Sequence, residues 1–247
     1  MTLLPPEVSP ALAAGLAAVG FGTSGLAAAF GLGGGAILLG VLASVLPPAA
    51  LIPVHGVVQL ASNLGRAALL AREIRPAPLA GFALGAVLGA GAGGLLVTAL
   101  PGATVRIAVG AFLVWSALAP PPAGFGRTSA LAGAASSLLT MFVGATGPFV
   151  AAWVKGLGLP RTGFVATHAA MMTVQHGLKT LAFGLLGFAF GPWLGLIALM
   201  AGAGVLGTLA GRRALLRIDE RLFGRVLSAV LALLGLNLVR LGVQGLL

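Results

Sequence analysis

The stretch HGVVQLASNLGR (residues 55–66) has a counterpart 113 residues further along the chain, HAAMMTVQHGLK (residues 168–179). Without any gap, this shift places His55 on His168 and Arg66 on Lys179. The chain holds only 3 histidines and 14 lysines and arginines, so matches of these types in one frame are far less expected by chance than matches of leucine. The two stretches therefore predict an internal duplication.

The same frame aligns two glycine-rich breaks, GLGGG (residues 31–35) and GATGP (residues 144–148). Further along, it pairs two groups of glycines: Gly89, Gly91 and Gly94 with Gly202, Gly204 and Gly207. The duplication divides the chain into a first repeat, residues 1–122, and a second repeat, residues 123–247. We expect the two repeats to form one transmembrane domain.

Both repeats are too apolar for a soluble protein. The chain has 247 residues, of which 59% are hydrophobic and 7% are charged, and its mean hydropathy is +1.11. Backbone polar groups within lipid must be hydrogen-bonded inside the span, which leaves helices or closed barrels. The apolar runs are continuous and do not alternate like barrel strands, so the sequence predicts an all-α integral membrane protein. The chain has no cysteine, which excludes disulfides and cysteine–metal chemistry.

Ten apolar segments are predicted, five in each repeat. They cover residues 8–30, 33–46, 51–71, 78–100, 104–119, 128–145, 148–158, 162–186, 192–211 and 222–243. Two of them, 33–46 and 148–158, are short and begin at the glycine-rich breaks. A helix needs about 20 residues to cross the hydrocarbon core. We therefore expect broken or re-entrant helices at these two positions.

The basic residues indicate how the segments are oriented. If the N-terminus lies outside and every segment crosses, most of the loop charges fall on the cytoplasmic side: Arg72, Arg75, Arg127, Lys155, Arg161, Arg212, Arg213, Arg217 and Arg221. This is the positive-inside bias of a multi-pass protein of the cell (inner or plasma) membrane, with both termini outside. The bias also allows the segment pairs 1–2 and 6–7 to be re-entrant hairpins. Because the net charge of +10 is scattered through short loops, a nucleic-acid partner is excluded.

Five segments per repeat is an odd number, so the second repeat should be inverted in the membrane relative to the first. Inverted repeats with broken helices at matching positions are typical of secondary transporters. In such proteins the substrate binds near the bilayer midplane, where the repeats meet. The sequence thus predicts a substrate site between the two glycine-rich breaks.

Polar residues form a stripe on the third segment of each repeat. His55, Gln59, Ser62 and Arg66 share one helix face, with Asn63 at its edge. The matching stripe of the second repeat contains His168, Met172, Gln175, His176 and Lys179. An ionisable group inside the membrane costs at least about 2.5–3.5 kcal/mol, so it normally faces a cavity or a ligand.

The charge of the two stripes favours an anionic substrate. They carry Arg66 and Lys179 but no acid, and the nearest acid along the first stripe, Glu73, lies at the end of its segment. Free backbone N–H groups at the starts of the two short helices add positive potential. The alternative is that Arg66 and Lys179 extend to the membrane surface. The predicted substrate-binding residues are Arg66, Lys179, Asn63, His176, Gly34, Gly35, Gly147, Ser24, Ser137, Thr146, Gln59 and Gln175.

These motifs resemble those of a known family. GLGGG, HGVVQLASNLGRA (residues 55–67) and VGATGPF (143–149) followed by THAAMMTVQHGLK (167–179) are similar to the sulfite exporter TauE/SafE family of 4-toluene-sulfonate-uptake-type permeases. The resemblance covers nearly the whole chain. It implies outward transport of sulfite, sulfoacetate or other sulfonates, thought to be driven by the proton gradient, with no metal or organic cofactor.

Proton coupling requires a group that titrates, and the predicted segments contain no carboxylate in their interior. His55, His168 and His176 are the only side chains that titrate near neutral pH. Because they lie on the same stripes as Arg66 and Lys179, we expect one or more of them to couple protonation to anion movement.

Other functions also fit parts of the sequence. A symmetric anion site serves a passive channel or a small organic-acid carrier as well. The GTSG stretch (residues 22–25) has the GxSG pattern of rhomboid intramembrane proteases, in which Ser24 would be the nucleophile. That pattern is short in a chain rich in glycine, and catalysis would need a histidine within hydrogen-bond reach of the serine. The sequence therefore favours a transporter over an enzyme.

Overall fold

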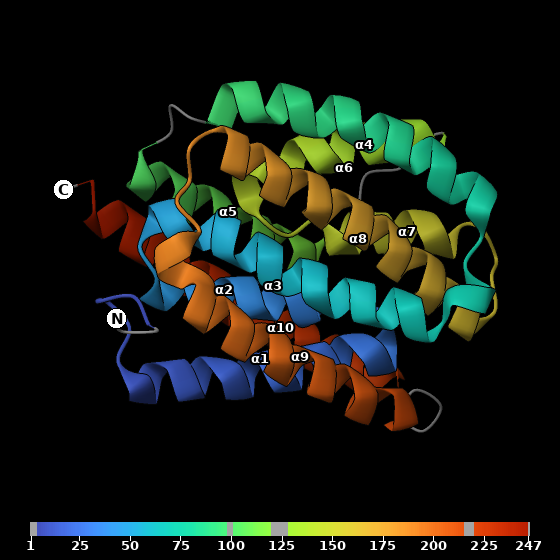
Figure 1. The fold of residues 1–247 in the computed structure, drawn as a ribbon, viewed down its shortest axis with the longest axis horizontal. Coiled ribbons are helices and arrows are strands. Elements are labelled where there is room, and N and C mark those ends of the chain that lie inside the picture. The colour runs from blue at the N-terminus through green and yellow to red at the C-terminus, as the bar shows by residue number, and fades with distance from the viewer. Residues whose placement is uncertain (1–3, 98–100, 120–127, 215–219, 247) are drawn as a thin grey trace.

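The computed structural model describes residues 4–97, 101–119, 128–214 and 220–246. At residues 214 and 220–224 it describes the backbone but not the side chains. Within these ranges the chain forms only helices and connecting segments (Figure 1). The first half contains α1 (Pro10–Phe30), α2 (Gly34–Val45), α3 (Pro48–Leu69), η1 (Ala71–Glu73), α4 (Pro76–Val97) and α5 (Gly102–Leu118). The second contains α6 (Ser129–Val143), α7 (Gly147–Lys155), α8 (Arg161–Leu185), η2 (Gly191–Trp193), α9 (Leu194–Ala214) and α10 (Glu220–Gln244). Each predicted segment corresponds to one α-helix, so the all-α prediction is confirmed.

Four of the helical segments are long and apolar enough to cross a membrane: Pro10–Phe30, Pro76–Val97, Gly191–Arg213 and Arg225–Gln244. Leucines on the outer face of α4 are 72–82% exposed, as expected of side chains that contact lipid: Leu84, Leu88 and Leu95. The chain is therefore a multi-pass membrane protein. Ten crossings and the side of each terminus stay predictions. The loop charges Arg127 and Arg217, and the boundary between the repeats at 122–123, lie outside the described residues.

The two glycine-rich breaks end helices as predicted. Helix α1 ends at Gly31, whose φ is 83°, and Gly33 follows with φ 92°. Helix α6 ends at Gly144, whose φ is 80°. Positive φ is costly for residues with a side chain, so these positions require glycine. The helices that follow have 12 and 9 residues and are about 18 and 14 Å long, too short to cross about 30 Å of hydrocarbon.

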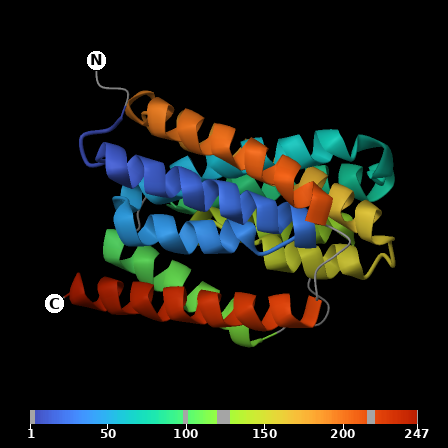
Figure 2. The same ribbon diagram turned by 90° about the horizontal axis from the view of Figure 1, so that it is seen from below.

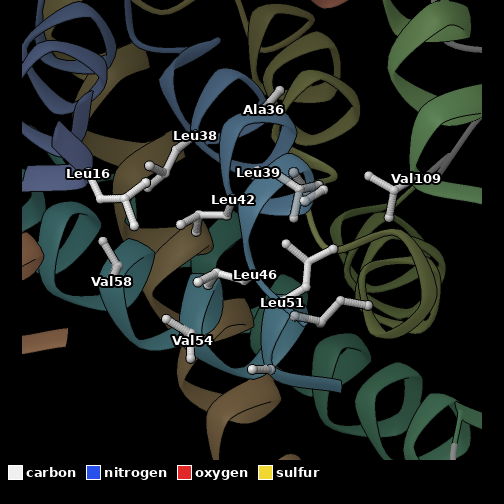
Figure 3. Packing of buried hydrophobic residues seen from close by; sticks show 14 of the residues in the cluster. Leu16, Ala36, Leu38, Leu39, Leu42, Leu46, Leu51, Val54, Val58 and Val109 are labelled. Carbon is white, nitrogen blue, oxygen red and sulfur yellow. The ribbon is translucent and has the colours of Figure 1, made fainter. Parts of the chain in front are cut away.

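Helix α2 is buried among other helices. Leu38, Leu39 and Leu42 are fully buried, and they pack against Leu16 of α1, Val58 of α3 and Val109 of α5 (Figure 3). A short helix leaves no lipid-exposed backbone when protein covers it. This packing meets the condition under which a broken helix is stable inside a membrane.

The long helices pack in pairs that join the two halves. Helix α1 packs along α9 and α4 packs along α6, while α3 contacts α8 and α5 contacts α10. Figure 1 shows α4 with α6 along one edge, α1 with α9 along the opposite edge and α3 with α8 between them. Figure 2 shows α5 and α10 side by side. Replacing each helix by its counterpart in the other half gives the same set of pairs: α1 with α9 becomes α6 with α4, and the pairs α3–α8 and α5–α10 are recovered. This symmetry supports the duplication. The inverted orientation in the membrane stays a prediction.

Glycine contacts correct the register of the duplication in the fourth helices. An added Cβ at Gly89 would overlap the carbonyl oxygen of Ala134, and one at Gly207 would overlap that of Phe21. Ala134 and Phe21 are 113 residues apart, whereas Gly89 and Gly207 are 118 apart. Gly89 therefore matches Gly207, and the pairing of Gly89 with Gly202 is wrong. The shift arises because α4 begins at Pro76 but α9 begins at Leu194, five residues later in the 113-residue frame.

A polar cavity between the two helix breaks

A central cavity lies where the two breaks meet α3 and α8. It encloses about 360 Å³ of empty space, its open mouth included. Residues from both breaks line it, among them Gly31, Gly33, Ala145 and Pro148. Eight of the predicted site residues also line it: Gly35, His55, Gln59, Asn63, Arg66, Gly147, His168 and His176. The structure thus brings the two stripes and the two breaks together around one space.

Arg66 is the cation of this cavity, and its side chain is held in place by its own helix. The residue is 3% exposed. Its Nη2 donates to Oδ1 of Asn63 at 2.7 Å. Asn63 in turn donates from Nδ2 to the carbonyl oxygen of Gln59 at 2.7 Å and to Gln59 Oε1 at 3.3 Å. Because Gln59, Asn63 and Arg66 are spaced by one turn each, this chain of hydrogen bonds orients the guanidinium along α3.

No carboxylate is placed to neutralise Arg66 within the described part of the chain. Glu7 precedes α1 and Glu73 is exposed in η1, and the other two acids, Asp219 and Glu220, lie beyond the described side chains. The Nε atom of Arg66 is buried without a hydrogen-bond partner. A buried cation that lacks a partner is costly, so a bound anion would stabilise this arrangement.

Two histidines fix the first turns of the short helices. His55 Nε2 lies 2.9 Å from the carbonyl oxygen of Gly35, and His168 Nε2 lies 3.1 Å from that of Gly147. A carbonyl oxygen only accepts, so Nε2 carries the proton in both rings. In the neutral rings Nδ1 is then an acceptor, and it has no hydrogen-bond partner in either residue. Each ring thus keeps one nitrogen that can take up a proton.

His176 lies next to His55 across the α3–α8 contact. The ring centroids are 5.8 Å apart and the rings meet edge to face. His176 is 2% exposed, and its Nδ1 also has no hydrogen-bond partner. In the 113-residue frame it occupies the position of Asn63, so the second half places a titratable ring where the first half places an amide. The cavity therefore joins one arginine with three histidines.

Lys179 is not among the residues that line this cavity, although the sequence predicts it as a ligand. It is fully buried, and its Nζ donates to the carbonyl oxygen of Gly144 at 2.7 Å. Gly144 ends α6, where unpaired carbonyl groups give the helix terminus a partial negative charge. The lysine thus stabilises the second break, whereas its counterpart Arg66 faces the cavity.

The remaining predicted residues support the walls of the cavity and do not line it. Ser24 Oγ accepts a hydrogen bond from Ser62 Oγ at 3.0 Å. Gln175 Nε2 donates to Thr146 Oγ1 at 3.0 Å, next to the second break. Ser137 is fully buried, and a Cβ at Gly34 would overlap the carbonyl oxygen of Thr23. The hydrogen bonds of Ser24 and Gln175 and the close approach at Gly34 hold helices together behind the cavity, whereas the Ser137 hydroxyl is buried without a hydrogen-bond partner.

Sequence reasoning missed two contributors to the site. Arg161 at the start of α8 donates from Nη2 to the carbonyl oxygen of Ala29 at 3.1 Å, so it caps the end of α1 as Lys179 caps α6. From the sequence, Arg161 counts only as a loop charge. Met172 lines the cavity at the position that matches Gln59. It lies on the predicted stripe, but its thioether gives no signal of anion binding.

A multi-pass helical protein with a buried cation and two helix breaks around a central cavity has the architecture of a membrane transporter. The chain matches the sulfite exporter TauE/SafE family over residues 16–238. It belongs to this family, and the resemblance seen in its motifs is confirmed. No match was found among curated proteins or among solved structures.

Proposed function

We propose that this protein transports a small sulfur oxyanion, sulfite or a sulfonate such as sulfoacetate, out of the cell through the central cavity. The observation that carries the proposal is the buried guanidinium of Arg66, which lines the cavity without a carboxylate partner among the described side chains and is oriented by Asn63. A guanidinium presents N–H donors in a planar fork that matches two oxygens of one oxyanion. The family supports the same class of substrate.

The first turns of α2 and α7 add to the attraction for an anion. Gly35 and Gly147 line the cavity at the N-terminal ends of these helices. Helix N-termini carry partial positive charge and unpaired N–H groups. Glycine also keeps space free there, because a Cβ at Gly35 would lie 3.2 Å from Cδ of Gln59. An oxyanion can therefore approach the backbone of both halves at once.

A panel of anions tests the proposal. Purified protein in detergent is heated with sulfite, sulfoacetate, another sulfonate, sulfate or acetate, and the midpoint of unfolding is measured. We expect sulfite or a sulfonate at about 100 times its Kd to stabilise the protein by about 2.7 kcal/mol. Sulfate should act less and acetate least. Equal shifts with every anion, or no shift with any, would exclude a selective site for sulfur oxyanions.

We further propose that the three histidines couple transport to protons. Their Nδ1 atoms lack hydrogen-bond partners, and all three rings line the cavity that contains Arg66. A proton taken up at Nδ1 would place a second positive charge near Arg66, so protonation of the cavity would change its affinity for the anion. Binding of the anion would in turn change the affinity for the proton by the same factor, as linkage requires.

Replacing all three histidines with glutamine should uncouple transport from the proton gradient. In proteoliposomes loaded with sulfite, an imposed pH gradient should change the initial rate in the natural protein but not in the triple variant. Glutamine retains an N–H donor for the carbonyl groups of Gly35 and Gly147, so the helix breaks are expected to stay formed. If the triple variant responds to pH like the natural protein, another group carries the proton.

Two other functions compete with this proposal. A passive channel or an organic-acid carrier would use the same cation, and saturation of the flux together with a response to the pH gradient separates the proposed carrier from the channel. A serine protease is disfavoured because, among the described residues, the hydroxyl of Ser24 bonds to Ser62 and to no histidine that could take its proton. If a fluorophosphonate labels the natural protein and this labelling is lost in Ser24→Ala, the protease would be favoured.

The proposal includes ten crossings, inverted halves and both termini outside. The pairs α1–α9 and α4–α6 are counterparts of each other in the two halves, and this symmetry supports the proposal. The distribution of basic loop residues supports it as well. The two halves would then share a pseudo-twofold axis through the central cavity. Cysteine substitutions in the loops, labelled from one side of intact cells, test this topology.

A further inference from the structure

A second cavity adjoins the central one, and Arg66 lines both. It lies between α1, α3 and α9 and encloses about 210 Å³ of empty space, its open mouth included. Its other lining residues are Ala28, Leu69, Leu70, Thr208 and Arg212. The walls are thus apolar except for two arginines and one hydroxyl, and none of the lining residues is acidic.

Thr208, like Thr180 of α8, has a buried hydroxyl that lacks a hydrogen-bond partner. Thr23 and Thr173 each donate to the carbonyl oxygen four residues earlier, at 2.8 Å. This back-bonding is the usual solution for a threonine inside a helix. Thr208 is 1% exposed, yet its Oγ1 has no hydrogen-bond partner. A buried hydroxyl without a partner is costly, so the wall of this cavity holds a donor that a ligand would satisfy.

Arg212 brings a second positive charge to the same cavity. It follows Thr208 by four residues, so the two side chains lie on one face of α9. Arg212 is exposed in the last turn of α9. An exposed cation at an opening raises the local concentration of anions. The cavity is therefore bounded by a buried arginine at one end and an exposed arginine at the other.

We propose that this second cavity is an additional site for the oxyanion, formed by Arg212, Thr208 and Arg66, and that the anion passes through it on its way to or from the central cavity. The inference rests on the proposed function for the nature of the anion. Arg66 takes part in both sites, so it can stay paired with an anion while the anion moves between them. Such overlap of sites avoids a step in which the anion is buried without a cationic partner.

Transport measurements test the role of this site. Thr208→Val retains the shape of the side chain but removes the hydroxyl, and Arg212→Gln removes the charge. Each should lower the initial rate of sulfite transport at low sulfite concentration, Thr208→Val by about tenfold, and saturating sulfite should restore the rate. Arg213→Gln is the matched control on the neighbouring exposed residue, and its rate should equal that of the natural protein. Natural rates in both variants, or equal losses in all three, would overturn the inference.

A bromide experiment separates the second site from the proposed function. Crystals of the natural protein in sodium bromide should show anomalous density between Thr208 and Arg212, and crystals of Arg212→Gln should lose it. If the natural protein transports none of the anions in the panel but this density is present, the proposed substrate class is wrong and the second site stands. Absence of density there in the natural protein refutes the second site, even if sulfite transport is observed.

Discussion

Replacing Arg66 with methionine should abolish anion binding without unfolding the protein. The guanidinium is the cation that lines the central cavity, and Asn63 holds it in one orientation. Truncating one partner of a buried charged pair typically costs 2–5 kcal/mol of binding. We therefore expect the affinity for sulfite to fall by at least about 100-fold, or roughly 3 kcal/mol. Thermal shift and isothermal titration of purified protein measure the loss.

The stability of the anion-free variant gives an independent readout. Arg66 is a buried charge without a carboxylate partner among the described side chains, so methionine removes an unfavourable burial and retains most of the side-chain volume. The variant also leaves Asn63 Oδ1 without this donor, which offsets part of the gain, so the midpoint of unfolding without anion should change little. Arg66→Lys keeps the charge but loses the fork held by Asn63, so its affinity should be intermediate.

Control variants show whether the effect belongs to the cavity. Arg240→Ala removes an exposed arginine of α10 that, among the described residues, bonds along its own helix to Asn237 and Gln244, and it should bind sulfite normally. Lys179→Met should behave differently, because the carbonyl oxygen of Gly144 loses its charged donor and keeps only the Thr140 hydroxyl. That variant should be less stable by about 1–3 kcal/mol. Natural sulfite affinity in Arg66→Met would refute the proposed site.

The sequence was sufficient to predict which polar side chains line the central cavity, because helix periodicity and the repeat act together. A polar stripe predicts which side chains share a face, and the 113-residue frame predicts which stripes belong together. Asn63, Arg66, His168 and His176 line one cavity for this reason. The breaks at Gly31 and Gly144 could also be predicted, since glycine punctuates helices through its access to positive φ.

The remaining details depend on tertiary contacts that no periodic pattern encodes. Lys179 has the same frame position as Arg66, yet it meets the end of α6 because its neighbours differ. The second cavity combines Ala28, Arg66 and Thr208, which are far apart in sequence and belong to three helices. A single threonine in an apolar helix gives no signal of its own. Matching residues in a repeat therefore predict a shared position but not a shared partner.

The second large effect follows from the register of the fourth helices, because Gly89 and Gly207 lie where two helices approach closely. At both positions a Cβ would overlap a backbone carbonyl of the partner helix, which cannot move aside as a flexible side chain can. Close glycine contacts of this kind drive helix association in membranes. Gly89→Ala and Gly207→Ala should each force the helices apart and cost about 2 kcal/mol.

Gly91 and Gly202 supply matched controls on the same two helices. Both are exposed, and a Cβ at either position would meet nothing within 4 Å. Alanine has a higher helix propensity than glycine, so Gly91→Ala and Gly202→Ala should leave the midpoint of unfolding unchanged or raise it. Gly89→Ala and Gly207→Ala should lower it by about 4–8 °C. If Gly202→Ala were the destabilising change and Gly207→Ala were tolerated, the 113-residue frame would extend through α9 and the helix contacts described above would be wrong.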